Sequence, residues 1–181
     1  IDVALNRQLN AILHHPDFQA MEARWRGLAM LVRVGRRGGA DVKVKILNAS
    51  WKELTRSMQR ASDFDQSALF ELIYNREFGM PGGEPYGLMV GDYYLGPEEP
   101  GGDTVSTLSD ISTVAAAAFC PFVAGAAPGS AGLEDFHELD RVHDFSWLES
   151  DPSRLRWNRL RTQEDMRFTG LVAPRLLMGQ P

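Results

Sequence analysis

The sequence of 181 residues contains a single cysteine, Cys120, and no long hydrophobic run. One cysteine cannot form an intramolecular disulfide bond, which excludes a small secreted scaffold held together by disulfides. The longest apolar stretch is residues 114–122, whereas a membrane-spanning helix needs about 20 apolar residues. The sequence therefore predicts a protein without a transmembrane helix that folds around its own hydrophobic core.

The motifs of common enzyme classes are also missing. Residues 129–132 (GSAG) lack the spacing of a nucleophile elbow, and residues 79–83 (GMPGG) have neither the lysine nor the following helix of a phosphate-binding loop. His137 and His143 are six residues apart, not the four that place two imidazoles on one helix face. His14 and His15 stand at a predicted helix break, where we expect a cap and a packing residue. No catalytic, cofactor or metal site is predicted from these motifs.

Charge is divided along the chain, although the formal net charge is only −5. Residues 1–60 contain 11 basic and 5 acidic residues, residues 61–150 contain 2 and 16, and residues 151–181 contain 6 and 3. Two interpretations remain open. The charged faces either pair within the fold or form complementary contacts between subunits, in which charge sets register and orientation more than affinity.

Hydrophobic periodicity predicts an alternation of helices and strands. Helices are predicted over residues 5–13, 16–35, 51–60, 65–78 or 67–78, 104–119 and 151–161. Ser50 and Glu53 form a predicted capping box, and Asp151 with Pro152 marks another helix start. Strands are predicted over residues 42–46, 86–95, 122–124 and 169–178, with a bulge or a close backbone approach at Gly91.

This order predicts a single α/β domain over residues 1–181, with a mixed α+β arrangement as the variant. Its centre is a mixed sheet of about four strands with helices packed on it. We expect one core that contains most of Leu28, Leu31, Ile46, Leu69, Phe70, Ile73, Val90, Ile111, Val114, Phe122 and Leu171.

Several charged residues are candidates for a role. Asp92 lies in an aromatic strand, which favours a buried structural ion pair with Arg161 or Arg175 over a position on the wet face or a catalytic role. The possible interface residues are Arg33, Arg36, Arg37, Glu98 and Glu99. An acidic-site hydrolase or metal-binding enzyme would use Asp92, Glu98, Glu99 and His137. A nucleic-acid binder would use Arg33, Arg36, Arg37, Lys43 and Lys45.

Four segments carry a resemblance to a known family. They are ILHHPDFQAMEARWRGLAMLV (12–32), FDQSALFELIYNREFGMPGGEPYGLMVGDYYL (64–95), STVAAAAFCPFVA (112–124) and WNRLRTQEDMRFTGLVAPRLL (157–177). In this order and spacing they resemble the large subunit of the contractile sheath of the bacterial type VI secretion system, the TssC, VipB or EvpB family. Members of this family are longer, so the resemblance implies an N-terminal-to-middle fragment of a sheath subunit.

The resemblance implies a structural function. Such a subunit pairs with a small sheath subunit (TssB/VipA-like) and polymerises with other copies of itself around an inner tube. Contraction of the sheath then propels the tube and its effectors out of the cell. The implied location is the bacterial cytoplasm, and the implied partners include the inner tube protein and the baseplate, but no nucleic acid and no membrane. The family offers no catalytic residue and no cofactor to assign to this chain.

Overall fold

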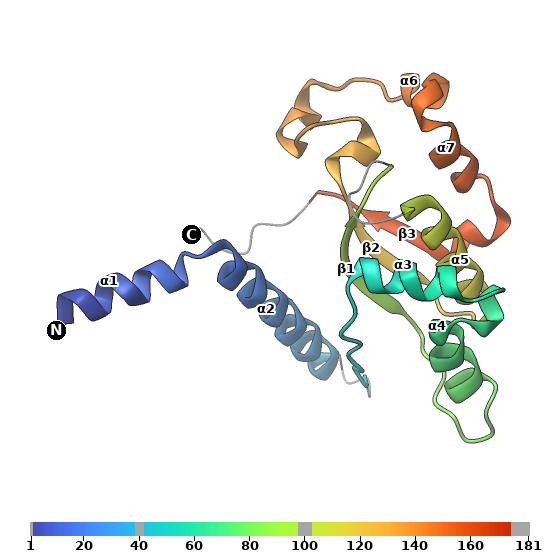
Figure 1. Ribbon diagram of the computed structural model, residues 1–181, viewed down its shortest axis with the longest axis horizontal. Coiled ribbons are helices and arrows are strands. Elements are labelled where there is room, and N and C mark those ends of the chain that lie inside the picture. Colours follow the sequence, from blue (N-terminus) through green and yellow to red (C-terminus); the bar gives the residue numbers. More distant parts are fainter. Residues whose placement is uncertain (1, 39–41, 98–102, 175–181) are drawn as a thin grey trace. The chain divides into compact units, whose positions relative to one another are not determined.

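The computed structural model describes residues 2–38, 42–97 and 103–174 (Figure 1). The chain divides into two compact units, Ile1–Asn48 with the last residues and Ala49–Leu176, which are described separately. The elements are, in order, α1 (Asp2–Leu13), α2 (Pro16–Arg37), α3 (Trp51–Arg60), η1 (Phe64–Gln66), α4 (Ala68–Phe70), η2 (Glu71–Phe78), β1 (Met89–Leu95), α5 (Thr104–Ala117), β2 (Phe122–Ala126), η3 (Pro128–Ala131), η4 (Phe136–Arg141), α6 (Trp147–Ser150), η5 (Pro152–Arg154), α7 (Leu155–Arg161), η6 (Glu164–Phe168) and β3 (Thr169–Val172).

The first unit consists mainly of two helices. Pro16 ends α1 and begins α2, because it lacks the N–H that a continuing helix needs and already has a helical φ. His15 is the N-cap, and its Nδ1 accepts a hydrogen bond of 3.3 Å from the backbone N–H of Asp17. This confirms the predicted cap at the histidine pair. No described side chain of residues 5–48 is fully buried, so this unit has no core of its own within that range.

The second unit contains a three-stranded parallel sheet with strand order β1-β2-β3. A register shift between Gly91 and Tyr94 confirms the predicted bulge. Gly91 also confirms the predicted close approach, since a Cβ there would come within 2.8 Å of the Phe122 ring. Parallel strands need long crossover connections, and the segments with α5 and with α7 supply them.

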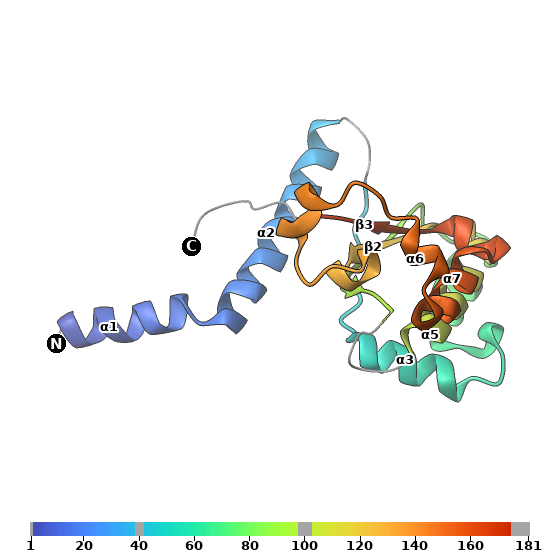
Figure 2. The ribbon, with the colours of Figure 1, turned by 90° about the horizontal axis from the view of Figure 1, so that it is seen from above.

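Helices cover one face of this sheet. Figures 1 and 2 show α5 close to the strands, and α7 contacts α5. The core joins Leu108, Ile111 and Val114 of α5 to Phe122 of β2 and Leu160 of α7, all at most 5% exposed. The capping box predicted for α3 is present, with the Glu53 side chain accepting from the Ser50 backbone N–H at 2.8 Å.

No described helix of this unit covers the opposite face of the sheet. Burial alternates along β1, so Val90 is 63% exposed and Tyr94 is 40% exposed, and Val172 of β3 is 59% exposed. Parallel sheets in complete domains usually have both faces covered by helices. Val90 was predicted to lie in the core, and this prediction is wrong because its side chain points to the uncovered face.

The predicted fold class is confirmed as mixed α/β, and the details of the sheet differ. The described residues form three parallel strands, not a mixed sheet of about four. Residues 42–50 have no regular secondary structure, so the strand predicted at 42–46 is wrong. Alternation of apolar and polar residues shows that two faces differ, but a strand also needs a ladder partner, and no described strand pairs with this segment.

The core prediction is confirmed for Leu69, Phe70, Ile73, Ile111, Val114 and Phe122, which are at most 9% exposed. Leu28 and Leu171 are half-buried. Leu31 and Ile46 are exposed, because they belong to the unit in which no described side chain is fully buried. The prediction of one domain over residues 1–181 stays a prediction.

Candidate assembly surfaces

One face of α2 forms a shallow groove with an apolar part and a basic part. Its lining residues, here called the α2 groove, are Trp25, Leu28, Ala29, Val32, Arg33, Arg36 and Arg37. These positions follow the spacings of three and four that place residues on one side of a helix. The spacing alone therefore explains why residues spread over more than three turns share one surface.

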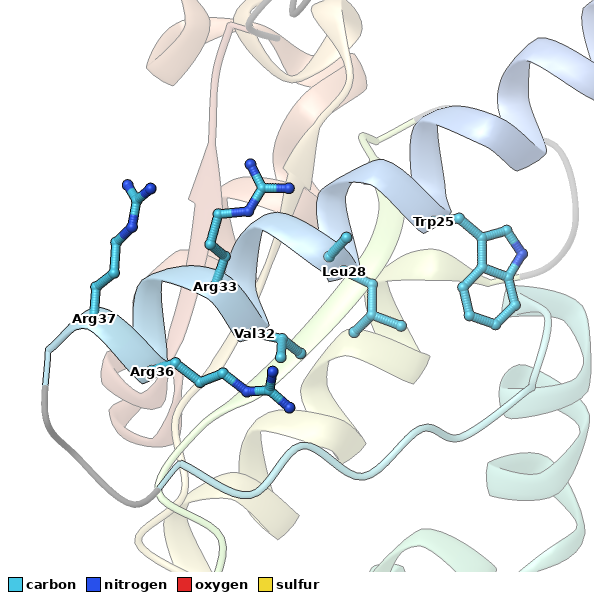
Figure 3. A pocket seen from close by; sticks show the side chains of 7 residues that line it. Trp25, Leu28, Val32, Arg33, Arg36 and Arg37 are labelled. Carbon is cyan, nitrogen blue, oxygen red and sulfur yellow. The ribbon is translucent and has the colours of Figure 1, made fainter.

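The groove is apolar towards the middle of α2 and basic at its end. Figure 3 shows Leu28 and Val32 between Trp25 and the three arginines. Trp25 is 61% exposed, a large apolar surface for a side chain in contact with water. The arginines stand in the last two turns, where the helix dipole favours positive charge. Residues 27–37 contain no acidic residue, and no described carboxylate pairs with these arginines.

A second surface lies in the second unit and has the opposite charge. Residues 140–149 (DRVHDFSWLE), here called the acidic aromatic segment, contain three carboxylates and two exposed aromatic rings. Phe145 is 40% exposed and Trp147 is 49% exposed. Leu148, beside Trp147, is only 8% exposed and lies against Gly132. The segment thus displays apolar and negatively charged groups together.

The acidic aromatic segment is held by the residues around it. The Asn158 side chain of α7 donates a hydrogen bond of 2.8 Å to the carbonyl of Leu148. Gly132 has a φ of +70°, and a Cβ at this position would come within 2.5 Å of the Trp147 ring. The buried Arg154 donates to the carbonyls of Gly129 and Ser130 and so secures the turn that contains Gly132. Trp147 is therefore fixed in position although half of it is exposed.

The carboxylate of Asp144 is stabilised in its charged form. It accepts hydrogen bonds from the backbone N–H of Ser146 at 2.9 Å and from the Ser146 hydroxyl at 2.6 Å. The hydroxyl, first, and then the backbone N–H lower the pKa of Asp144 below its ordinary value. Asp144 is consequently ionised throughout the neutral pH range.

The residues predicted from the sequence fall on different surfaces. Arg33, Arg36 and Arg37 come together in the α2 groove. Asp92 is exposed on β1, so the prediction that it is buried is wrong: it stands on the face of the sheet that no helix of its unit covers. Its pairing with an arginine stays a prediction. Arg161 is exposed at the end of α7, and Arg175, Glu98 and Glu99 lie outside the described residues.

The described residues give no support to a metal or thiol site. No group of three His, Cys, Asp or Glu residues in residues 2–38, 42–97 and 103–174 is arranged to hold a metal ion. Cys120 is fully buried, and burial raises the pKa of its thiol to about 11. Within the same ranges, no helix is long and apolar enough to cross a membrane.

An exposed aromatic residue that the sequence pattern did not indicate follows α5. Phe119 has a φ of +49° and is 70% exposed, at the position after a helix where glycine is usual. Its ring lies 6.2 Å from that of Phe78 and 6.1 Å from that of Phe168, measured between centroids. Neither composition nor periodicity marks this conformation, because the preceding alanines fit a continuing helix. Phe145 was also missed, because it stands alone between polar residues.

Comparison with known proteins shows the family to which the chain belongs. The family described as EvpB/VC_A0108, tail sheath N-terminal domain (VipB), matches residues 1–181. The chain belongs to this family. The resemblance inferred from the four sequence segments is therefore confirmed, and the family is one of structural sheath proteins, not of enzymes.

A relative of the chain occurs in Pseudomonas aeruginosa. The protein named type VI secretion system sheath protein TssC1 is 37% identical to this VipB-family chain over 183 residues. The match covers 100% of the chain but 36% of the P. aeruginosa protein. The chain thus spans little more than a third of that relative's length.

Proposed function

We propose that this chain is the N-terminal-to-middle part of a large subunit of the type VI secretion contractile sheath. In this function the subunit pairs with a small sheath subunit and polymerises with further copies around the inner tube, attached to the baseplate. It acts in the bacterial cytoplasm, and contraction of the polymer drives the tube outwards. The work of such a protein depends on contacts between subunits, not on a chemical step.

The observation that supports this proposal most strongly is the α2 groove on a chain of the sheath family. Exposed apolar groups rimmed by charged residues are a common feature of interaction sites, and Trp25, Leu28 and Val32 lie beside three arginines in this way. Trp25 and three arginines are residue types that are enriched at binding hot spots. The groove therefore has the composition of an assembly interface.

A repeated interface also fits contraction. Rigid subunits that change their mutual contacts pass between two discrete arrangements, and the free energy is distributed over many copies of the same contact. The arginines of the α2 groove set the orientation of such a contact, while Trp25, Leu28 and Val32 supply its apolar area.

Electron microscopy of a reconstituted sheath tests the proposal. The full-length protein that contains this chain is co-expressed with the small sheath subunit, purified and imaged in negative stain. We expect regular tubules from the native sequence. We expect fewer tubules from the triple variant Arg33→Glu, Arg36→Glu and Arg37→Glu, because like charges then face the surface that the arginines bind.

The matched control is Lys52→Glu, which reverses one exposed charge on α3, outside the groove. It should form tubules as the native protein does. Absence of tubules from the native sequence, with both subunits soluble and folded, would contradict the sheath function. Normal tubules from the triple variant would show that the groove is not part of the assembly interface.

A further inference from the structure

We infer that the α2 groove binds the acidic aromatic segment, residues 140–149, of a second copy of this chain. The inference rests on the proposed sheath function and deepens it, because it names the occupant of the groove. Its basis is that two separate surfaces of one chain are complementary in both charge and polarity.

The α2 groove and the acidic aromatic segment carry net charges of opposite sign. The groove presents Arg33, Arg36 and Arg37 without an acidic residue among them, whereas the segment presents Asp140, Asp144 and Glu149 against the single cation Arg141 and so is net negative. Within the described residues no cation pairs with these three carboxylates. Two surfaces of opposite sign attract each other and suppress wrong partners and wrong registers.

Both surfaces expose apolar side chains. Phe145 and Trp147 alternate with polar residues in the segment, and both remain about half exposed although Leu148 beside them is buried. In the groove, Leu28 and Val32 are half-buried and Trp25 is 61% exposed. Each surface therefore combines aromatic or aliphatic groups with a net charge, positive on the groove and negative on the segment, which is the composition of an interface core with a polar rim.

The acidic aromatic segment is ordered before it binds a partner. Gly132, Arg154 and Asn158 hold the segment in place, and two hydrogen bonds from Ser146 orient the Asp144 carboxylate. A segment that is already ordered loses less conformational entropy on binding than a mobile loop does. The structure thus maintains the exposed Trp147 ring and the Asp144 carboxylate in a fixed arrangement.

The symmetry of the inferred contact is that of an open polymer. The groove and the segment are different surfaces of the same chain, so their contact is heterologous: the groove of one copy binds the segment of the next. Heterologous contacts that do not close into a ring generate open helical filaments. A sheath is such a polymer, and the inferred contact supplies one of its repeating links.

The size of the surface decides when the contact forms. A fully buried aromatic side chain removes about 150–250 Å² from water, so the partly exposed rings here bury only part of that. A stable interface needs about 800 Å² per partner. The contact is therefore too small to hold two free copies together, and it forms where other sheath contacts already keep the copies adjacent.

Disulfide trapping between two differently tagged copies tests the inference. One copy of the full-length protein carries Val32→Cys and the other carries Phe145→Cys, and both are co-expressed with the small sheath subunit. Mild oxidation of assembled tubules should give a cross-linked band that contains both tags on a non-reducing gel. The matched control pairs Val32→Cys with Leu155→Cys, since Leu155 is 54% exposed on α7 but lies outside the segment. That control should give no such band.

Charge reversal provides the second readout. Arg36→Glu with Arg37→Glu on the first copy should lower the yield of the band about tenfold, because like charges then face each other. Asp144→Lys with Glu149→Lys on the second copy should restore it. Tubules that form normally but give no mixed band would overturn this inference and leave the proposed function intact. In a separate variant, one chain carries both Val32→Cys and Phe145→Cys, and a disulfide that forms only within that chain would also overturn the inference. Failure of the native protein to assemble would overturn both.

Discussion

Gly132 makes the sharpest test of how the acidic aromatic segment is held. Its φ of +70° lies in the left-handed region, where an L-residue costs about 1–2 kcal/mol more than glycine. In Gly132→Ala the new Cβ would also lie 2.5 Å from the Trp147 ring and 2.8 Å from Leu148, an overlap that costs about 1–3 kcal/mol. Because alanine lowers the conformational entropy of the unfolded chain, it also stabilises the folded state by about 0.4–1 kcal/mol. We expect a net loss of about 2–4 kcal/mol in the free energy of unfolding.

Urea unfolding followed by far-ultraviolet circular dichroism measures this loss. With a slope of about 2 kcal/mol per molar urea, the midpoint should fall by about 1–2 M. Gly129→Ala is the matched control, because no atom lies within 4 Å of its added Cβ and Gly129 does not have a positive φ. Its midpoint should stay the same or rise slightly. Equal midpoints for the two variants would refute the arrangement of Trp147 against Gly132.

Three further predictions concern the core, the thiol and one ion pair. Phe70→Ala should cost about 3–5 kcal/mol in a urea titration, because Phe70 is buried and its ring lies 4.7 Å from that of Tyr74, whereas Phe145→Ala should cost almost nothing in the isolated chain. Cys120 should resist thiol reagents at pH 8 until urea unfolds the chain, since its thiol has a pKa of about 11, and fast labelling of the native chain would contradict its burial. Arg156 lies 2.6 Å from Asp103 and lowers the pKa of that carboxyl, so the stability that the pair contributes is present above the ordinary pKa and is lost as pH falls through the lowered one. Arg156→Gln should therefore lower the melting temperature at pH 7 and make less difference as the pH falls below about 4, and an equal difference at both pH values would contradict this assignment.

Local signals in the sequence located most of the helices. The Ser50–Glu53 capping box and the Pro16 helix start are read from side chains that act within one turn, so they need no knowledge of the fold. The bulge at Gly91 was likewise predictable, because a residue without a Cβ in a strand marks a close approach. The predicted start of that strand was three residues early, since Tyr86 and Leu88 fit a strand by composition alone.

Properties that depend on distant parts of the chain were not predictable in the same way. Residues 42–46 have the alternation of a strand, but pairing depends on a neighbour that the pattern does not reveal. The apolar stripe of α2 predicted burial, and the structure instead leaves Leu31 52% exposed. Periodicity identifies which residues share a face, but it does not distinguish a core from an intermolecular interface.

The candidate interface was half predictable. The separation of basic and acidic residues pointed to Arg33, Arg36 and Arg37 as possible contacts, and the structure gathers them on one helix face beside Trp25. The complementary segment was not identified, because the exposure of Phe145 and Trp147 depends on how Gly132 and Asn158 place the chain.

A reconstruction of the assembled sheath by electron cryomicroscopy tests the central claim most directly. The measurement is the identity of the residues that cover Trp25, Leu28 and Val32 in a tubule made of the full-length protein and the small sheath subunit. Our account predicts density for residues 140–149 of a neighbouring copy, with Asp144 and Glu149 beside the arginines of the α2 groove. A tubule in which this groove faces solvent, or is covered by another part of either subunit, would contradict it.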